Sequence, residues 1–128
     1  MPNIRPVPAF DDNYIWLLSD PQTSEACVVD PGDAQPVIAA LEKEGLSLAA
    51  ILITHHHYDH IGGLKTLCDT YNPVVFGPTN DAIDPVTTRV SAGDSVEVLG
   101  TSFSVLEVPG HTLDHIAYFH DGDQPLLF

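Results

Sequence analysis

Several potential metal ligands lie close together in the stretch Thr54-His55-His56-His57-Tyr58-Asp59-His60. Burying so many imidazoles and a carboxylate costs free energy unless they bind a metal or one another. Along an extended chain His55 and His57 can point to the same side, whereas Asp59 and His60 reach a neighbouring point after a turn. This spacing predicts two adjacent metal ions on a loop that follows a strand.

A further ligand should come from elsewhere in the chain, and His111 is the natural candidate. It lies in Pro109-Gly110-His111-Thr112, at the end of an apolar run. Imidazole and carboxylate donors suit zinc, iron or manganese. Three protein ligands leave one position of a zinc ion open for water, whose pKa falls toward neutrality, so that hydroxide can attack a carbonyl. The pattern therefore predicts a hydrolytic metal site.

The other histidines have simpler interpretations. His56 and His120 are read as exposed or hydrogen-bonded side chains, and His115 as a residue that packs near the His111 loop or orients it. The alternative for the whole cluster is a His-rich surface tract with adventitious metal affinity. The predicted order of strand, loop and helix around the cluster favours a specific metal site over such a surface tract.

Hydrophobic periodicity places the cluster in an α/β pattern. Strands are predicted over 14–18 and 26–30 as a hairpin, and again over 49–54 and 74–77. A helix is predicted over 34–44, with Gly45 following it as a stop signal. A second helix is predicted over 61–71. Residues 49–77 thus form a strand-helix-strand unit. Beyond Pro78, an antiparallel meander is predicted from short strands over 95–99, 103–108 and 116–119, and Pro125 to Phe128 resembles the start of another strand.

Composition narrows the class of protein. The 128 residues read as one globular unit, and 18 acidic against 4 basic residues give a formal charge of −14. Such a charge disfavours binding to nucleic acid or to an anionic membrane. Cys27 and Cys68 lack the spacing of a redox or zinc motif, so buried free thiols are expected. The absence of a signal peptide pattern or a membrane-spanning run then favours the cytoplasm.

The motifs resemble a known family. The pattern H-x-H-x-D-H with a later Gly-His-Thr loop is similar to the metallo-β-lactamase superfamily. Three segments are similar to hydroxyacylglutathione hydrolase, also called glyoxalase II, and the likeness runs nearly end to end. These segments are Pro8 to Trp16, Val29-Asp30-Pro31-Gly32-Asp33-Ala34 and Thr54 to Gly63.

The resemblance implies a fold, an activity and roles for individual residues. It implies the N-terminal half of a four-layer αβ/βα sandwich with up to two Zn²⁺ ions, iron or manganese being alternatives. The implied reaction, part of methylglyoxal detoxification, converts S-lactoylglutathione to D-lactate and glutathione. His55, His57 and His111 match the ligands of the first metal, and Asp59 and His60 match ligands of the second. Asp59 also matches the catalytic group that holds the attacking nucleophile and handles its proton.

Two departures from the family pattern are visible. Asp114 stands where the family has glycine in its Gly-His-Thr-x-Gly-His loop. The family also continues past Phe128, into a Gly-Asp-Thr segment with a bridging aspartate and into a helical glutathione-binding domain. Residues 1–128 are therefore expected to form an incomplete domain that binds at most one metal firmly, has little activity, and can associate with a second copy. The alternatives are another hydrolase of the superfamily and a non-catalytic metal-binding module.

Overall fold

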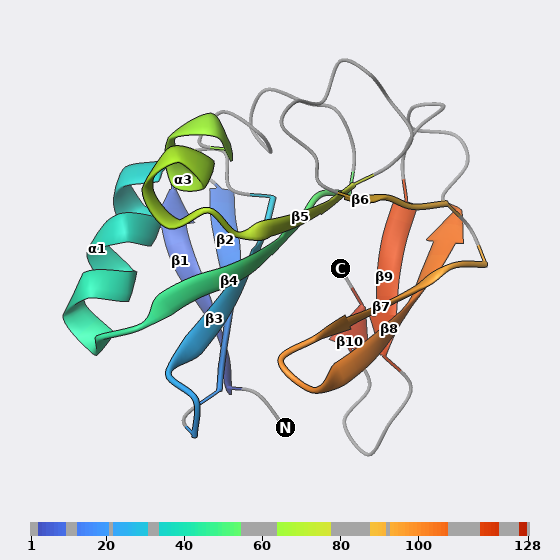
Figure 1. Cartoon of the computed structure of the whole chain (residues 1–128), viewed down its shortest axis with the longest axis horizontal. Helices are drawn as coiled ribbons and strands as arrows, with labels where there is room; N and C mark the ends of the chain where they lie inside the picture. Colours follow the sequence, from blue (N-terminus) through green and yellow to red (C-terminus); the bar gives the residue numbers. More distant parts are fainter. Residues whose placement is uncertain are drawn as a thin grey trace.

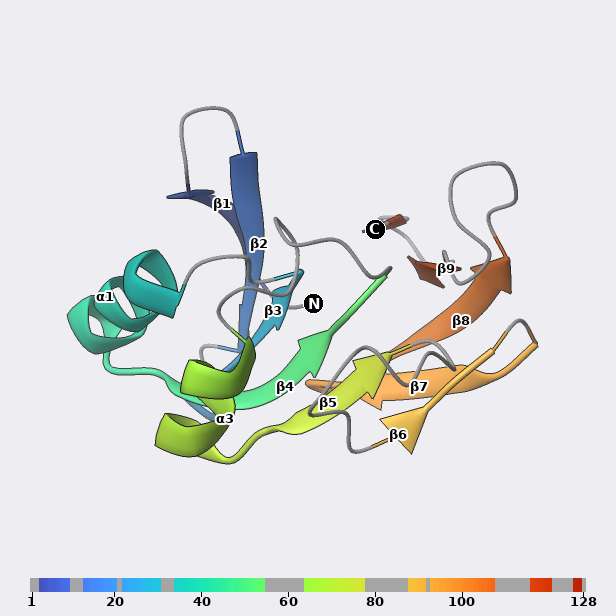
Figure 2. The same cartoon turned by 90° about the horizontal axis from the view of Figure 1, so that it is seen from above.

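The structure is a computed structural model of the whole chain, and it describes the residues in nine ranges. These ranges are 3–9, 13–20, 22–30, 34–54, 64–77, 88–91, 93–107, 116–120 and 126–127. They form two sheets that lie face to face, with helices on one outer side (Figures 1 and 2).

The first sheet has the strand order β1-β2-β3-β4-β5-β6. β1 pairs antiparallel with β2 and β2 with β3, whereas the pairs from β3 through β6 are parallel. The carboxyl ends of β3, β4 and β5 therefore lie side by side at the same end of this sheet. The strands are β1 (Asn3–Ala9), β2 (Asn13–Asp20), β3 (Glu25–Val29), β4 (Ser47–Leu52), β5 (Val74–Gly77) and β6 (Thr88–Arg89).

Two helices cover one face of this sheet. α1 (Ala34–Glu44) and α3 (Leu64–Tyr71) bury Val37, Leu41 and Leu67 against alternate strand residues such as Val28 and Ile51. α1 stops where predicted, because Gly45 adopts a positive φ of 66°. The N–H groups of Leu46 and Gly45 then donate to the carbonyl oxygens of Leu41 and Glu42, which closes the helix end.

The second sheet packs on the other face of the first. It is an antiparallel meander with the order β10-β9-β8-β7. Phe103, Val105 and Tyr118 are buried against Leu52 and Val29 of the first sheet. Its strands are β7 (Ser95–Val98), β8 (Thr101–Glu107), β9 (Ile116–His120) and β10 (Leu126–Leu127).

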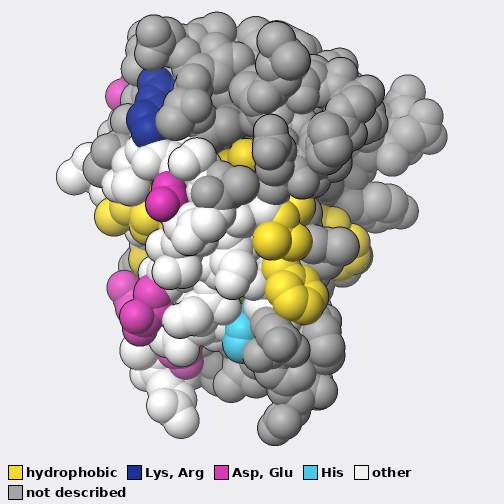
Figure 3. Space-filling model, turned by 90° about the vertical axis from the view of Figure 1, so that its right-hand side faces the viewer, with side chains coloured by type: hydrophobic (Ala, Val, Ile, Leu, Met, Phe, Trp, Pro, Cys, Tyr) yellow, Lys and Arg dark blue, Asp and Glu magenta, His cyan; other side chains and the backbone are white. Residues whose placement is uncertain are grey.

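The outer face of the second sheet remains partly apolar and no described helix covers it. Leu106 on β8 is 41% exposed. Figure 3 shows hydrophobic side chains and a histidine on this side of the molecule. Whether a second copy binds there stays a prediction. Among the described residues, no helix is long and apolar enough to cross a membrane.

Most predicted elements are confirmed, including the hairpin, the strand-helix-strand unit and the meander. The strand predicted over 49–54 differs, since β4 begins at Ser47 and ends at Leu52. Of the two predicted buried thiols, Cys27 is buried, but Cys68 is only half-buried on α3. The prediction for Cys68 was therefore wrong in its degree of burial.

Candidate metal centre

The predicted ligands themselves, His55, His57, Asp59, His60 and His111, lie outside the described residues. Their immediate neighbours do not. The residue before His55 and the residue after the 111–115 segment are Thr54 and Ile116, and both are described. The site can therefore be built from the two points at which the chain enters the ligand segment and leaves the His111 segment.

Thr54 is held by the carboxylate of Asp30, which directly follows β3. The Thr54 N–H donates to Asp30 Oδ1 at 2.8 Å, and the Thr54 hydroxyl donates to Asp30 Oδ2 at 2.6 Å. Thr54 is only 4% exposed. Hydrogen bonds to an ionised carboxylate are about twice as strong as neutral ones, so Asp30 fixes both the backbone and the side chain of the last residue before His55.

Two hydrogen bonds join β9 to the same strand end. The Ile116 N–H donates to the carbonyl oxygen of Thr54 at 2.8 Å. The Tyr118 hydroxyl donates to the carbonyl oxygen of Ile53 at 2.7 Å. We call Asp30, Ile53, Thr54, Ile116 and Tyr118 the junction. It connects the two sheets and joins Thr54 to Ile116, the described residues next to the two ligand segments.

Backbone geometry and charge at the junction follow from this arrangement. Asp30 has a positive φ of 51°, a conformation that Asp tolerates better than most residues but that still costs energy. Burial, and next the nearby Asp30 charge, raise the pKa of Tyr118 well above its usual range. Tyr118 is therefore protonated at any physiological pH and acts as a hydrogen-bond donor.

The thiols of the chain do not belong to the candidate donor set. Cys27 is fully buried between the two sheets, and burial raises the pKa of its thiol. Burial, and next the charge of Asp69, raise the pKa of Cys68. The remaining donors are imidazole nitrogens and a carboxylate, a set that fits zinc, iron or manganese. Within the described ranges, no group of three or more His, Cys, Asp or Glu residues is placed to hold a metal.

Comparisons with known proteins identify the superfamily of the chain. Residues 10–128 match the sequence model of the metallo-beta-lactamase superfamily. The chain belongs to this superfamily. The solved structure of the BLEG-1 B3 metallo-beta-lactamase is 28% identical with a TM-score of 0.77, over 92% of this chain and 67% of that one. The structure of ETHE1 from Myxococcus xanthus is 33% identical with a TM-score of 0.76, over 91% and 52%.

The chain is also similar to curated hydroxyacylglutathione hydrolases. The protein of that name from Chromohalobacter salexigens is 55% identical over 128 residues, which make up 100% of this chain and 50% of the relative. The one from Pseudomonas fluorescens is 49% identical over 123 residues, 95% of this chain and 48% of the relative. The chain thus spans about half the length of these curated relatives.

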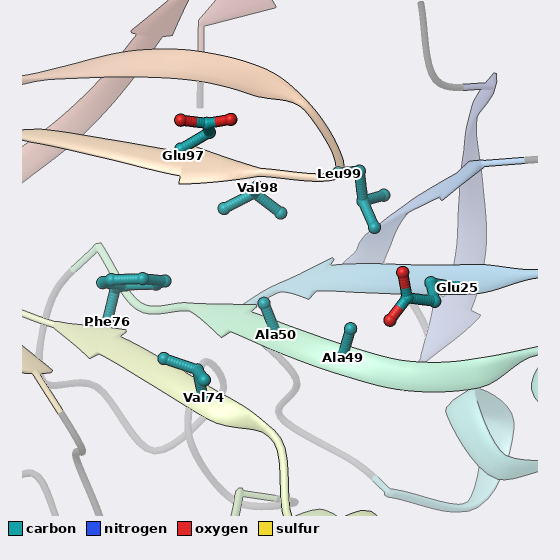
Figure 4. Close-up of a pocket in the computed structure, with 8 residues that line it drawn as sticks. All are labelled: Glu25, Ala49, Ala50, Val74, Phe76, Glu97, Val98 and Leu99. Atoms are coloured by element: carbon teal, nitrogen blue, oxygen red, sulfur yellow. The ribbon is translucent and has the colours of Figure 1, made fainter. Parts of the chain in front are cut away.

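A pocket lies between the two sheets, and one of its lining residues, Phe76, accepts hydrogen bonds from Tyr118 and Ile53 of the junction. It has a volume of about 210 Å³ and is lined by Glu25, Ala49, Ala50, Val74, Phe76, Glu97, Val98 and Leu99. Glu25 and Val74 are the first residues of β3 and β5, so the pocket extends to the beginnings of these parallel strands. Figure 4 shows Val98 pointing into it and the Glu97 carboxylate on the far side of β7. We do not assign this pocket to the metal centre.

Three residues of the junction were not predicted from the sequence as part of the site. Asp30 was predicted as the end of the 26–30 strand, and Thr54 and Tyr118 as strand residues, and none of the three was given a role in the site. A signal for the first two was present, because a carboxylate and a hydroxyl that end neighbouring parallel strands meet at the same edge of a sheet. No sequence signal marked Tyr118, whose partner Ile53 is 65 residues away.

Proposed function

We propose that the protein is a metal-dependent hydrolase of glutathione thioesters, with S-lactoylglutathione as substrate and D-lactate and glutathione as products. The observation that carries the proposal is the hydrogen bond from Ile116 N–H to Thr54 O, because it places the entry to the His55 segment beside the exit of the His111 segment. The substrate class is taken from the name shared by the curated relatives.

In this proposal the five predicted ligands hold up to two Zn²⁺ ions, with iron or manganese as alternatives. His55, His57 and His111 would hold the first ion, and Asp59 and His60 would contribute to the second. When bound, zinc supplies a Lewis acid that polarises a carbonyl oxygen and lowers the pKa of water. The junction would keep the two ligand segments at the spacing that the ions need.

Asp59 would also manage the proton of the reaction. Its carboxylate oxygen accepts a proton from the attacking water as the C–O bond forms. When the C–S bond breaks, the electron pair remains on sulfur, and the glutathione thiolate takes up the proton held by Asp59. The new carboxylic acid releases its remaining proton to water. The products are a carboxylate and a thiol. Because both described cysteines are free thiols, a reducing compartment such as the cytoplasm is the proposed location.

A second candidate function is hydrolysis of β-lactams, which the similarity to a B3 metallo-beta-lactamase structure supports. The amide bond of a β-lactam poses the same problem of attack on a carbonyl carbon. The two functions differ in the leaving group, which is a thiolate in one case and an amine in the other. A third candidate is a metal-binding module without catalysis.

The test compares initial rates of the zinc-loaded protein on S-lactoylglutathione, a cephalosporin and a lactone. It uses both the 128 residues and a form extended to the length of the curated relatives. We expect the thioester to be preferred by the extended form at least about 100-fold, and residues 1–128 to bind one zinc firmly and turn over slowly. A chelator and the variant Asp59→Asn should abolish thiol release. Preference for the cephalosporin, or zinc binding without any hydrolysis by the extended form, would replace the proposed function with one of its rivals.

A further inference from the structure

Tyr118 has an unusual place among the buried residues of the described chain. Its side chain is 0% exposed and belongs to the core between the sheets. Its hydroxyl oxygen nevertheless lies 2.7 Å from the carbonyl oxygen of Ile53 and 3.3 Å from that of Phe76. A buried hydroxyl is costly unless it is hydrogen-bonded, so its position is tied to those two carbonyl groups.

The Tyr118 hydroxyl has a single proton, so it can donate a full hydrogen bond to only one of the two carbonyl oxygens. The shorter contact, to Ile53, is the stronger hydrogen bond. Phe76 O already accepts from the Ile53 N–H at 2.8 Å, so it does not depend on Tyr118. Loss of the hydroxyl would therefore remove a hydrogen bond from the carbonyl oxygen of Ile53, two residues before His55.

Tyr118 is also close to the other ligand segment along the chain. It lies on β9, whose first residue, Ile116, directly follows the 111–115 segment. The Ile116 N–H donates to Thr54 O. The Tyr118 hydroxyl adds a second bond to the preceding residue of that segment, at Ile53 O. β9 is already held by its pairing with β8, and these two bonds set how closely its first residues lie against the end of β4.

We propose that Tyr118 is a positioning residue, whose hydrogen bond to Ile53 sets the spacing between the His55–His60 segment and His111 and thereby the metal affinity. This inference rests on the proposed metal site. Residues that orient metal ligands without touching the metal alter metal affinity by about 10- to 100-fold when replaced. In this role Tyr118 acts through the backbone of Ile53.

The variant Tyr118→Phe removes only the hydroxyl. We expect zinc affinity to fall about 10-fold and the visible absorption of the cobalt-substituted protein to change, because the ligand geometry changes. The matched control is Val96→Ala, which perturbs the same core cluster from β7, a strand that does not pair with β9. It should lower the melting temperature but leave the zinc affinity and the cobalt spectrum unchanged.

A measurement on the unmodified protein covers the case in which Tyr118→Phe does not fold. Zinc should slow exchange of the Ile116 amide proton, which faces Thr54, more than that of Leu18 in the distant β2. Equal slowing, or an unchanged cobalt spectrum and affinity in Tyr118→Phe, would overturn the positioning role while leaving the metal site intact. No zinc binding by the unmodified protein would overturn the metal site and the positioning role together.

Discussion

Replacing His57 with alanine should remove firm zinc binding, with a loss in affinity of at least about 100-fold. His57 is one of three predicted imidazole ligands of the first ion, and its removal exceeds the 10- to 100-fold effect of residues that only support a ligand. The measurement is a calorimetric titration of the metal-free protein with zinc in competition with a chelator.

The matched control for His57→Ala is His120→Ala. His120 has its Nδ1 2.9 Å from the carbonyl oxygen of Ser102 and its ring centroid 5.9 Å from that of Phe103, and it has no predicted metal role. His56→Ala serves as a second control from within the cluster. Both should bind zinc like the unmodified protein. If His57→Ala retained full affinity, or if His120→Ala lost as much, the assigned ligand set would be wrong.

Replacing Asp30 with alanine should have the largest effect on stability. The change removes two charge-assisted hydrogen bonds to the buried Thr54 and puts alanine at a φ of 51°. We expect the free energy of unfolding to fall by about 3 kcal/mol. Zinc affinity should fall about 10-fold as well, since the end of β4 loses its anchor. Chemical denaturation and zinc titration of the same sample measure both effects.

The chain offers a close control for this variant. Asp94 uses one carboxylate oxygen to accept from Ser91 N–H at 2.8 Å and from the Ser91 hydroxyl at 3.5 Å, a similar arrangement at an exposed position. Asp94→Ala should cost less stability and leave zinc binding unchanged. Asp30→Asn, which tolerates the positive φ, separates the lost charge from the backbone strain. Equal effects of Asp30→Ala and Asp94→Ala would show that the junction does not support the site.

The fold was predictable from the sequence where periodicity and stop signals agreed. Helix α1 is an example, with apolar residues at helical spacing and Gly45 at its end. β1 escaped prediction because Pro6 and Pro8 argue against a strand. The structure explains how they are tolerated: β1 is the edge strand of its sheet, and alternate N–H groups of an edge strand do not face its neighbour.

The candidate site was only partly predictable, because its ligands and its support carry different signals. Closely spaced histidines announce metal chemistry through their side chains alone. The support depends on contacts that sequence spacing does not reveal, such as Thr54 with Asp30, 24 residues away. The end of β4 before Thr54 has the same origin, since Thr54 bonds to the Asp30 side chain and to Ile116 of the second sheet.

The central claim is that this chain binds metal through histidine and carboxylate side chains, and X-ray absorption spectroscopy of the zinc-loaded protein tests it most directly. The account predicts only nitrogen and oxygen donors, at about 2.0–2.2 Å, with the outer-shell scattering of several imidazole rings. Sulfur donors at about 2.3 Å, which would indicate Cys27 or Cys68, or a zinc ion surrounded by water alone, would contradict it.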